Sequence, residues 1–422
     1  MSTQISIAKD GKISDELYSV SRTEKVDIEF LRKNISEGKI VVLKNNSRNL
    51  SRPIAIGNGL RTKVGVEIGL VDKKGSIDIE SDKLVVANEA GVDLILDVTT
   101  GGYFDEIRNV LINSTMLPYG TIPVFQTAYK NYSEWDVSKI TKDNLFSTIE
   151  RHLNDGVDFL CLNCGLTKSV IKSYEDEKFA SIPASKSGIL TACAVKETGK
   201  ENPFYEYFDE LLDLVKKYDA VLFLSQGLRT SSIADAYSRA GAMEINISSE
   251  LAFRAIKAGI QTIIEVGGYM KFDKISSMIK NVKELSGNIP MYSKDVIPTD
   301  IALGYETMAS SIGYTNAALA GSNLLFASQN FIGKYDSAVL KEGIMSAKIA
   351  SHCADLVGNV KSQILRNENV TNALKNHDAI LYRESLVDGY SSNSEILEKL
   401  NNRSNRNPDC FSSIYDKYFK VD

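Results

Sequence analysis

The sequence predicts an α/β protein whose main body is a parallel (β/α)8 barrel, with an N-terminal cap, a C-terminal helical region and a tail. Short apolar runs rich in β-branched residues recur along the chain, and a longer segment with helical periodicity follows each run. This alternation occurs eight times, which is the number of strand and helix units in a closed barrel. A chain of 422 residues is also long enough for one large barrel with added terminal elements.

The segments between the strands have the pattern of amphipathic helices. Apolar residues fall at i, i+3, i+4 and i+7, and glycine often closes the segment, as in 81–91 and 248–259. The same pattern predicts helices over 144–156 and 203–218. The eight expected strands are VGVEI (64–68), DLILDV (93–98), TIPVF (121–125), DFLCLN (158–163), AVLFL (220–224), AMEIN (242–246), TIIEV (262–266) and IPMY (289–292).

We expect four parts along the chain. Residues 1–60 form a cap, with a helix near 27–37 followed by the strand IVVLKN, and the barrel occupies 61–330. Residues 331–400 supply C-terminal helices, and 401–422 form a tail. The polar run before the tail has too few apolar residues to pack by itself, so we expect a flexible linker there. Helices are expected near 304–320 and 335–357.

The charge balance gives no reason to expect a nucleic acid or an anionic membrane as a partner. The chain has 49 basic and 54 acidic residues, with a formal net charge of −5 and no basic block. The first residues lack the apolar region of a signal peptide, and no run of about 18 apolar residues occurs. We therefore expect a cytoplasmic protein.

The cysteines and histidines do not form an obvious metal site. Cys161 and Cys164 are the only cysteines close in sequence, and no second pair or histidine pair follows to complete a tetrahedral zinc site. Both lie in an apolar run, so we expect buried, reduced thiols. The three histidines, His152, His352 and His377, are far apart in the chain, which argues against a histidine-rich catalytic site.

Polar residues follow nearly every expected strand, where barrel enzymes carry their chemistry. The glycine-containing turns DVTTGG, SQGLRTSS and EVGGY can present backbone N–H groups to a phosphate, and Arg229 can add a bidentate contact. An alternative is that Arg229 pairs with Glu250 or Glu265 to hold the loop. Together these ends favour a small phosphorylated ligand. The residues are Glu67, Asp97, Thr99, Thr100, Phe125, Gln126, Asn163, Gln226, Arg229, Glu250, Glu265, Tyr292 and Asp300.

The stretch DVTTGGYFDEIRNVLINSTMLPYGTIPVFQ (97–126) resembles the anaerobic phosphomethylpyrimidine synthase (ThiC) family. The segments SQGLRTSSIADA, NISSELAFRA, IIEVGGY, IPTDIALGYETMASSIG and LKEGIMSAKIASHCADL resemble family counterparts in order and spacing. The resemblance extends from about Lys39 to His352 and on to the tail. Members of this family rearrange aminoimidazole ribotide with a radical made from S-adenosylmethionine, so the resemblance implies a substrate pocket for such a ribotide.

The resemblance also implies which residues contact the substrate. Those that match the family are Ser185, Gly227, Leu228, Arg229, Glu265 and Tyr292. Those that replace a different family residue are Glu67, Leu96, Phe125, Asn163, Lys186, Ser187 and Gln226.

The family's metal-binding positions are changed in this chain. Tyr269 and Phe331 stand where the family has two zinc-binding histidines. The family's tail cysteine triad, which holds a 4Fe-4S cluster, reads Cys410, Ser413 and Tyr418 here. One thiolate cannot hold such a cluster in the usual way, and phenylalanine has no donor atom. We therefore expect no cofactor held by this chain's own ligands, with S-adenosylmethionine, cluster and zinc chemistry left to a partner chain.

Three functions follow from the resemblance. The first is a subunit, in a homodimer or in a heterodimer with a cluster-bearing paralogue, like the paired paralogues that make 5-hydroxybenzimidazole for cobamide lower ligands from aminoimidazole ribotide. The second is a stand-alone, non-radical enzyme on a phosphorylated ribotide, in which Glu67, Glu265 and Gln226 surround the ligand and a buried carboxylate acts as general base. The third is a phosphomethylpyrimidine synthase of thiamine biosynthesis. Glu67 and Glu265 are the candidate catalytic residues, and whether the chain is catalytic by itself stays open.

Overall fold

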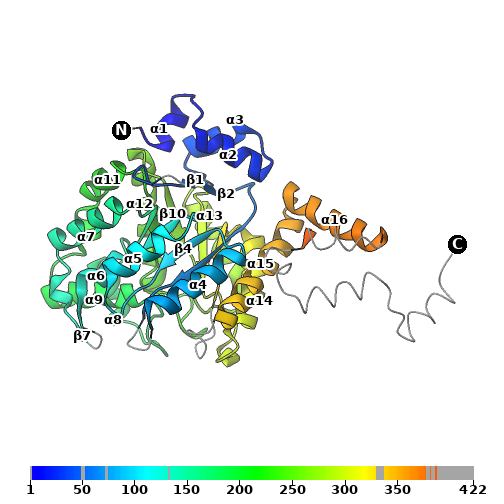
Figure 1. Cartoon of the computed structure of the whole chain (residues 1–422). Coiled ribbons are helices and arrows are strands. Elements are labelled where there is room, and N and C mark those ends of the chain that lie inside the picture. Colours follow the sequence, from blue (N-terminus) through cyan, green and yellow to red (C-terminus); the bar gives the residue numbers. More distant parts are fainter. Residues whose placement is uncertain are drawn as a thin grey trace.

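The computed structural model describes residues 2–48, 53–71, 75–131, 134–328, 337–376, 381 and 385–386. Its centre is a closed barrel of eight parallel strands, surrounded by helices (Figure 1). The expected α/β barrel is therefore confirmed. Around the barrel the strands follow one another in chain order: β3 (Lys63–Ile68), β4 (Leu94–Asp97), β5 (Tyr119–Thr121), β8 (Phe159–Leu162), β9 (Val221–Leu224), β10 (Thr262–Glu265), β11 (Met291–Lys294) and β12 (Leu324–Phe326).

Six of the eight expected strands lie where the sequence predicts them, and two predictions are wrong. The run 121–125 holds only the last residue of β5, because Pro123 opens the helix α6 (Pro123–Ala128). The run 242–246 lies inside the helix α12 (Arg239–Ala258), where Ser238 caps the first turn. The missing eighth strand is β12, which is only three residues long.

Eight helices alternate with the strands and form the outer ring. Serine or threonine side chains cap several of them by accepting a backbone N–H, as Ser76 and Thr141 do, and Gly259 and Gly321 end two of them in the left-handed conformation. The ring consists of α4 (Ile77–Glu89), α5 (Phe104–Asn113), α7 (Lys142–Asn154), α11 (Phe208–Lys216), α12, α13 (Phe272–Leu285), α14 (Glu306–Ala320) and α15 (Ser337–Val357).

Shorter elements fill the loops at the carboxyl ends of the strands. The connection from β8 to β9 is the longest and contains three extra helices, of which α9 is the one that reaches the functional site. These elements are α8 (Lys168–Glu175), α9 (Lys186–Thr198), α10 (Pro203–Glu206), the two-stranded sheet β6 (Tyr129–Asn131) and β7 (Glu134–Trp135), and the 3-10 turns η1 (Val137–Lys139) and η2 (Asp300–Ala302).

Large side chains fill the interior of the barrel. Phe159 and Phe223 stack with their ring centroids 4.4 Å apart, and Tyr292 and Phe326 continue the aromatic layer. Gly120 makes room for this layer, because a Cβ atom there would lie 2.1 Å from the ring of Phe159. The barrel interior is therefore a packed core.

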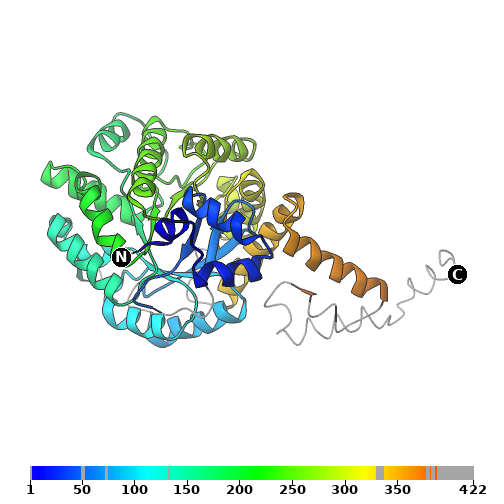
Figure 2. The same cartoon turned by 90° about the horizontal axis from the view of Figure 1, so that it is seen from above.

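An N-terminal cap closes the amino end of the barrel, as the view from above shows (Figure 2). It contains α1 (Gln4–Lys9), α2 (Asp15–Glu24), α3 (Ile28–Ser36) and the antiparallel hairpin of β1 (Ile40–Leu43) and β2 (Ile54–Gly57). One face of the hairpin packs into the barrel interior, and the other packs against the cap helices. Because successive side chains of a strand point to opposite faces, the hairpin joins the cap to the barrel by apolar contacts on both of its faces.

The C-terminal helices confirm the expected helices near 304–320 and 335–357. Helix α15 packs against α14, α4 and β3, so it is the helix that closes the outer ring. The segment 331–400, expected to follow the barrel, therefore contains a helix of the barrel itself. Helix α16 (Lys361–Asn376) follows and projects from the side of the ring (Figure 1). No helix in the described part of the chain is long and apolar enough to cross a membrane.

Candidate functional site

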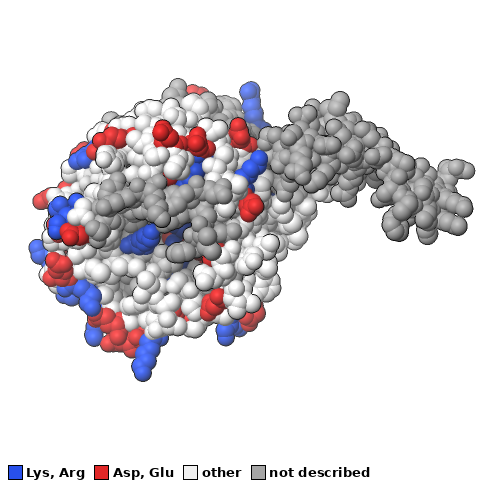
Figure 3. Space-filling view, turned by 60° about the horizontal axis from the view of Figure 1, so that its bottom comes forward, with Lys and Arg blue, Asp and Glu red and all other residues white. Residues whose placement is uncertain are grey.

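A cavity of about 330 Å³ opens at the carboxyl end of the barrel. Figure 3 turns this end toward the viewer, and basic atoms are visible in its central hollow. Side chains from strands far apart in the sequence converge here, as the parallel arrangement requires. Nine of the thirteen expected substrate-contact residues line the cavity: Glu67, Leu96, Phe125, Ser185, Lys186, Ser187, Arg229, Glu265 and Tyr292.

The best-ordered part of the cavity is a buried charge cluster centred on Glu265. Arg229 Nη1 donates to Glu265 Oε1 at 2.6 Å, and the Tyr292 hydroxyl donates to Oε2 at 2.7 Å. The backbone N–H of Gln226 adds a third donor at 3.0 Å. Glu265 is 3% exposed and Arg229 5% exposed, so both charges depend on this pairing. Three donors therefore hold the carboxylate that the sequence suggested as a general base.

Arg229 is held from several sides. Its Nη2 lies 3.3 Å from Asp295 Oδ2 and 3.4 Å from the carbonyl oxygen of Ala184. Although burial opposes it, the neighbouring Glu265 and Asp295 carboxylates raise the pKa of Arg229 above its usual value. The pairing with Glu265 is the alternative that the sequence left open. However, Arg229 Nε is buried without a partner among the described residues, so one N–H stays available to a ligand.

A second ion pair crosses the cavity from β11 to β3, between Lys294 and Glu67. Sequence reasoning ended the strand at Tyr292 and missed Lys294. Since side chains two residues apart share one face of a strand, Tyr292 and Lys294 both point into the barrel mouth. That periodicity is the signal that identifies the lysine. The ammonium group of Lys294 neutralises the charge of Glu67, which is the second candidate base.

The start of α9 supplies the most suitable place for a phosphate. Ser185 is its N-cap and accepts the backbone N–H of Gly188 at 3.2 Å, and Lys186 and Ser187 complete the first turn. These three residues line the cavity. The amino end of a 13-residue helix carries partial positive charge, and the two hydroxyls and the ammonium group add donors. The expected Ser-Lys-Ser contact element is therefore well placed for an anion.

Four expected contact residues lie outside this cavity. The backbone N–H groups of Gly227 and Leu228 donate to Glu244 at 2.5 and 2.9 Å, so a carboxylate of the protein already occupies the expected phosphate turn. Gln226 accepts the Gly267 N–H at 3.4 Å, and Asn163 donates to the Ser225 carbonyl at 3.2 Å. These residues build the wall behind the cavity.

Glu244 was missed because its segment was read as a strand. In α12 it is fully buried, and burial raises the pKa of its carboxyl group to about 7, against the lowering effect of the Gly227 and Leu228 N–H groups. It anchors the turn before Arg229. A glutamate among apolar residues with helical spacing is the sequence signal for such a buried anchor.

Cys161, Cys164 and His152 are buried among structural contacts. Cys161 and Cys164 are buried and free, which confirms the expectation, and burial raises the pKa of both thiols. His152 is also buried; its ring nitrogens lie 2.8 Å from Thr121 Oγ1 and 2.7 Å from Gln126 Oε1. Burial lowers the pKa of His152 well below its usual value, so it stays neutral. His377 lies outside the described residues.

The structure describes only one of the positions that the resemblance assigns to zinc and cluster ligands. Tyr269 packs against Ile297 and Ala309, and Phe331 lies outside the described residues. Cys410, Ser413 and Tyr418 also lie outside them, and their side chains offer a single thiolate. Within the part of the chain that the structure describes, no group of three or more His, Cys, Asp or Glu side chains is arranged to hold a metal ion.

Comparison with known sequences identifies relatives along nearly the whole chain. The family model described as Radical SAM ThiC matches residues 3–408. The phosphomethylpyrimidine synthase of Thermoanaerobacter sp. (strain X514) is 38% identical over 363 residues, which cover 85% of this chain and 84% of the relative.

Two further relatives are similar over the same extent. The phosphomethylpyrimidine synthase of Thermodesulfovibrio yellowstonii is 35% identical over 379 residues, or 89% of each chain. The protein named phosphomethylpyrimidine synthase 2 of Syntrophotalea carbinolica is 36% identical over 380 residues, covering 89% of this chain and 88% of the relative.

Proposed function

This chain belongs to the radical SAM ThiC family, and from that premise we propose that the cavity at the carboxyl end of the barrel binds a small phosphorylated ribotide. The observation that carries the proposal is the convergence of nine expected contact residues on one cavity of about 330 Å³. That volume lies in the range of small-molecule sites. Aminoimidazole ribotide is the ligand that the family resemblance favours.

The cavity has one end suited to phosphate and one suited to a polar ring. The phosphate lies at the start of α9, where Ser185, Lys186 and Ser187 surround it. Arg229 is adjacent, since its Nη2 reaches the Ala184 carbonyl, and its unpartnered Nε is a further donor. The ring lies toward Leu96 and Phe125, which give the cavity an apolar wall.

We propose that conversion of the ribotide requires a second chain. The zinc and cluster positions of this chain lack the necessary donors, whereas a cluster-bearing paralogue keeps them. When bound on the partner, the cluster and S-adenosylmethionine supply the radical. In that assembly this chain binds and orients the ribotide, and the product that the resemblance favours is 5-hydroxybenzimidazole.

The outer face of α14 is our candidate for the partner surface. Its one charged residue, Glu306, is buried, whereas every other helix of the ring presents charged side chains outward. Met308, Ile312 and Leu319 are exposed along one side of α14, and Ile349 is exposed on the neighbouring α15. A paralogue with the same fold has a corresponding face, so two chains can pair about a twofold axis and bury these residues.

Two alternatives differ in the product. The names of the relatives favour phosphomethylpyrimidine as the product, in which case the chain serves thiamine biosynthesis. A non-radical reaction needs a free base, but Glu265 accepts three hydrogen bonds and Glu67 is paired with Lys294. The geometry therefore gives the non-radical alternative less support.

Anaerobic co-expression with a cluster-bearing paralogue, followed by mass spectrometry of the products from aminoimidazole ribotide, tests the proposal. We expect 5-hydroxybenzimidazole only when both chains are present. The double variant Met308→Glu/Ile312→Glu should reduce co-purification of the partner, whereas Lys280→Glu on α13 should not. Phosphomethylpyrimidine made by this chain alone would overturn the two-chain proposal.

The isolated chain provides a second test. After anaerobic reconstitution it should contain little iron and sulfide, and after dialysis against a mild chelator little zinc, because each site lacks ligands. Stoichiometric cluster or one retained zinc per chain would show that this chain holds its own cofactors.

A further inference from the structure

A separate cavity, of about 270 Å³, lies between the ring helices α12 and α13. The loops that follow β9 and β10 supply the rest of its lining. Gln226 and Leu228, which build the wall behind the cavity proposed for the ribotide, also line this one. We call it the helix cavity. It is therefore a neighbour of the ribotide cavity, on the other side of a shared wall.

The inner lining of the helix cavity is apolar and uncharged. Among the described residues that line it, none carries a carboxylate, ammonium, guanidinium or imidazole group. Transfer of an unpaired charge into such surroundings is costly, so a phosphorylated or otherwise charged ligand does not fit here. The buried apolar side chains are those of Leu228, Ile245, Val266, Met270 and Val282.

Space remains between the two helices because α12 carries small residues where it lines the cavity. These are Gly241 and Ala242. A Cβ atom added at Gly241 would meet only the Ser238 hydroxyl oxygen, at 3.0 Å, so the space beside this glycine is otherwise open. Tyr237, also in the lining, is 45% exposed and has a left-handed backbone with φ 69°. Such strain in a residue other than glycine is concentrated at functional sites.

A few polar groups complete the lining. The Gln226 side chain accepts the Gly267 backbone N–H through Oε1 at 3.4 Å, and no described residue accepts a hydrogen bond from its Nε2. The amide therefore keeps a donor for a ligand. Asn246 and Asn281 are exposed on α12 and α13 at the surface of the cavity. An apolar lining with a small number of polar contacts is typical of sites for neutral small molecules.

We propose that the helix cavity is a second binding site, for a neutral aromatic molecule of one or two fused rings. An apolar cavity of about 150 Å³ admits benzene, and this one is larger. Met270 and Met278 line it, and methionine sulfur makes favourable contacts with aromatic rings. The Gln226 amide binds a ring nitrogen or a hydroxyl group. The product proposed above, 5-hydroxybenzimidazole, is of this class, and naming it as the natural ligand rests on the proposed function.

Calorimetric titration of benzimidazole into the full-length chain is the test. We expect one site, and we expect Ala242→Phe to weaken binding at least about tenfold, because the added ring takes up space in the cavity. Ala234→Phe is the matched control, since Ala234 is exposed in the loop before α12 and does not line the cavity. Met278→Ala removes a sulfur contact and should weaken binding about two- to tenfold. It keeps the test valid if Ala242→Phe does not fold.

Four results would overturn the proposal. The first two are absence of binding, and equal affinity in wild type and both lining variants. The third is loss of binding in Phe125→Ala but not in Ala242→Phe, which would place the ring against the apolar wall of the ribotide cavity. The fourth is equal affinity for benzimidazole-5-carboxylate, which we expect to bind at least about tenfold more weakly because its charge has no partner in the lining. The titration involves no turnover, so its failure leaves the proposed function untouched.

Discussion

The ion pairs at the two ends of the barrel have different roles. At the carboxyl end, Lys83, Lys186, Arg229 and Lys294 face Glu67, Glu80, Glu265 and Asp295, so cations and carboxylates are equal in number. At the amino end, Arg61 pairs with Asp93, and Lys63 pairs with Glu24 of the cap helix α2. The pairs at the carboxyl end line a cavity that can admit a ligand, whereas the pair with Glu24 joins the cap to the barrel. The difference predicts effects on both stability and ribotide binding at the carboxyl end, and no effect on ribotide binding at the amino end.

The largest expected effect is the loss of stability on breaking the buried Arg229–Glu265 pair at the carboxyl end of the barrel. Glu265→Ala leaves Arg229 buried without its main counter-charge, and removing one partner of a buried pair costs about 3–5 kcal/mol. Urea unfolding followed by circular dichroism measures the loss. Glu67→Ala is the control, because its pair with Lys294 is partly exposed and should contribute less than about 1 kcal/mol. Equal losses in both variants would contradict the assignment.

The pH dependence of stability comes next in size. The pKa of Glu244 is raised by burial to about 7 in the folded chain, from an ordinary value near 4.5. The folded state therefore holds its proton more tightly, so stability falls as pH rises from about 4.5 to about 7 and then levels off. Glu244→Gln should remove about 3 kcal/mol of this dependence, at 1.36 kcal/mol for each pKa unit. Denaturant titrations at several pH values measure it, and parallel curves for wild type and variant would refute it.

The expected loss of ribotide affinity on removing a contact at the carboxyl end of the barrel is smaller. Lys186→Ala removes one charged contact to the ribotide phosphate, worth roughly 1.5–3 kcal/mol, so affinity should fall about tenfold or more. Calorimetry with aminoimidazole ribotide measures the change. Lys196→Ala on the outer face of the same helix serves as the control, since Lys196 pairs with Glu175 at the surface. Unchanged affinity in Lys186→Ala would move the phosphate away from α9.

The smallest expected effect is that of a variant at the amino end of the barrel on ribotide affinity. Lys25→Ala at the amino end of the barrel should change ribotide affinity by less than about twofold, since distant sites without shared partners act independently. The same calorimetric titration measures it. A change as large as that of Lys186→Ala would show that the two ends are coupled.

The sequence predicted the barrel because its longer strands form apolar runs that can be recognised in the sequence. Six strands were found at their positions, but β12 is a three-residue strand between two helices and has too short a signal. The run 242–246 was misread because a buried glutamate among apolar residues resembles strand alternation over so few residues. In the folded chain, the tertiary packing of α12 makes this segment helical.

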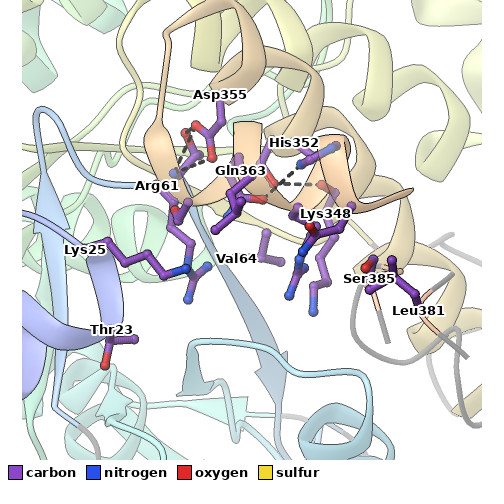
Figure 4. Close-up of a pocket in the computed structure, with 16 residues that line it drawn as sticks. Thr23, Lys25, Arg61, Val64, Lys348, His352, Asp355, Gln363, Leu381 and Ser385 are labelled. Atoms are coloured by element: carbon purple, nitrogen blue, oxygen red, sulfur yellow. Dashed lines mark hydrogen bonds between the residues drawn. The ribbon is translucent and has the colours of Figure 1, made fainter. Parts of the chain in front are cut away.

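The sequence predicted which residues gather at the candidate cavity better than it predicted their contacts. Nine of the thirteen residues that the resemblance assigned to the substrate line one cavity, and their contact with a substrate stays a prediction. The resemblance could not show that Glu244 occupies the Gly227 and Leu228 N–H groups, or that Lys294 neutralises Glu67, because those pairings join segments that only the folded barrel brings together. The cavity of about 420 Å³ at the amino end of the barrel has no sequence motif, since its lining residues come from both ends of the chain (Figure 4).

The register between β12 and β3 has a consequence for how the chain is made. Leu324 pairs with Lys63 and Phe326 with Gly65, so the last strand of the barrel closes on the first. On the ribosome, β3 emerges early and waits as an unpaired edge until residue 326 has left the exit tunnel. At about 5–20 residues per second, this interval lasts tens of seconds or less. An exposed edge strand pairs readily with other chains, so the nascent chain is most prone to aggregation in the interval before β12 emerges and closes the barrel.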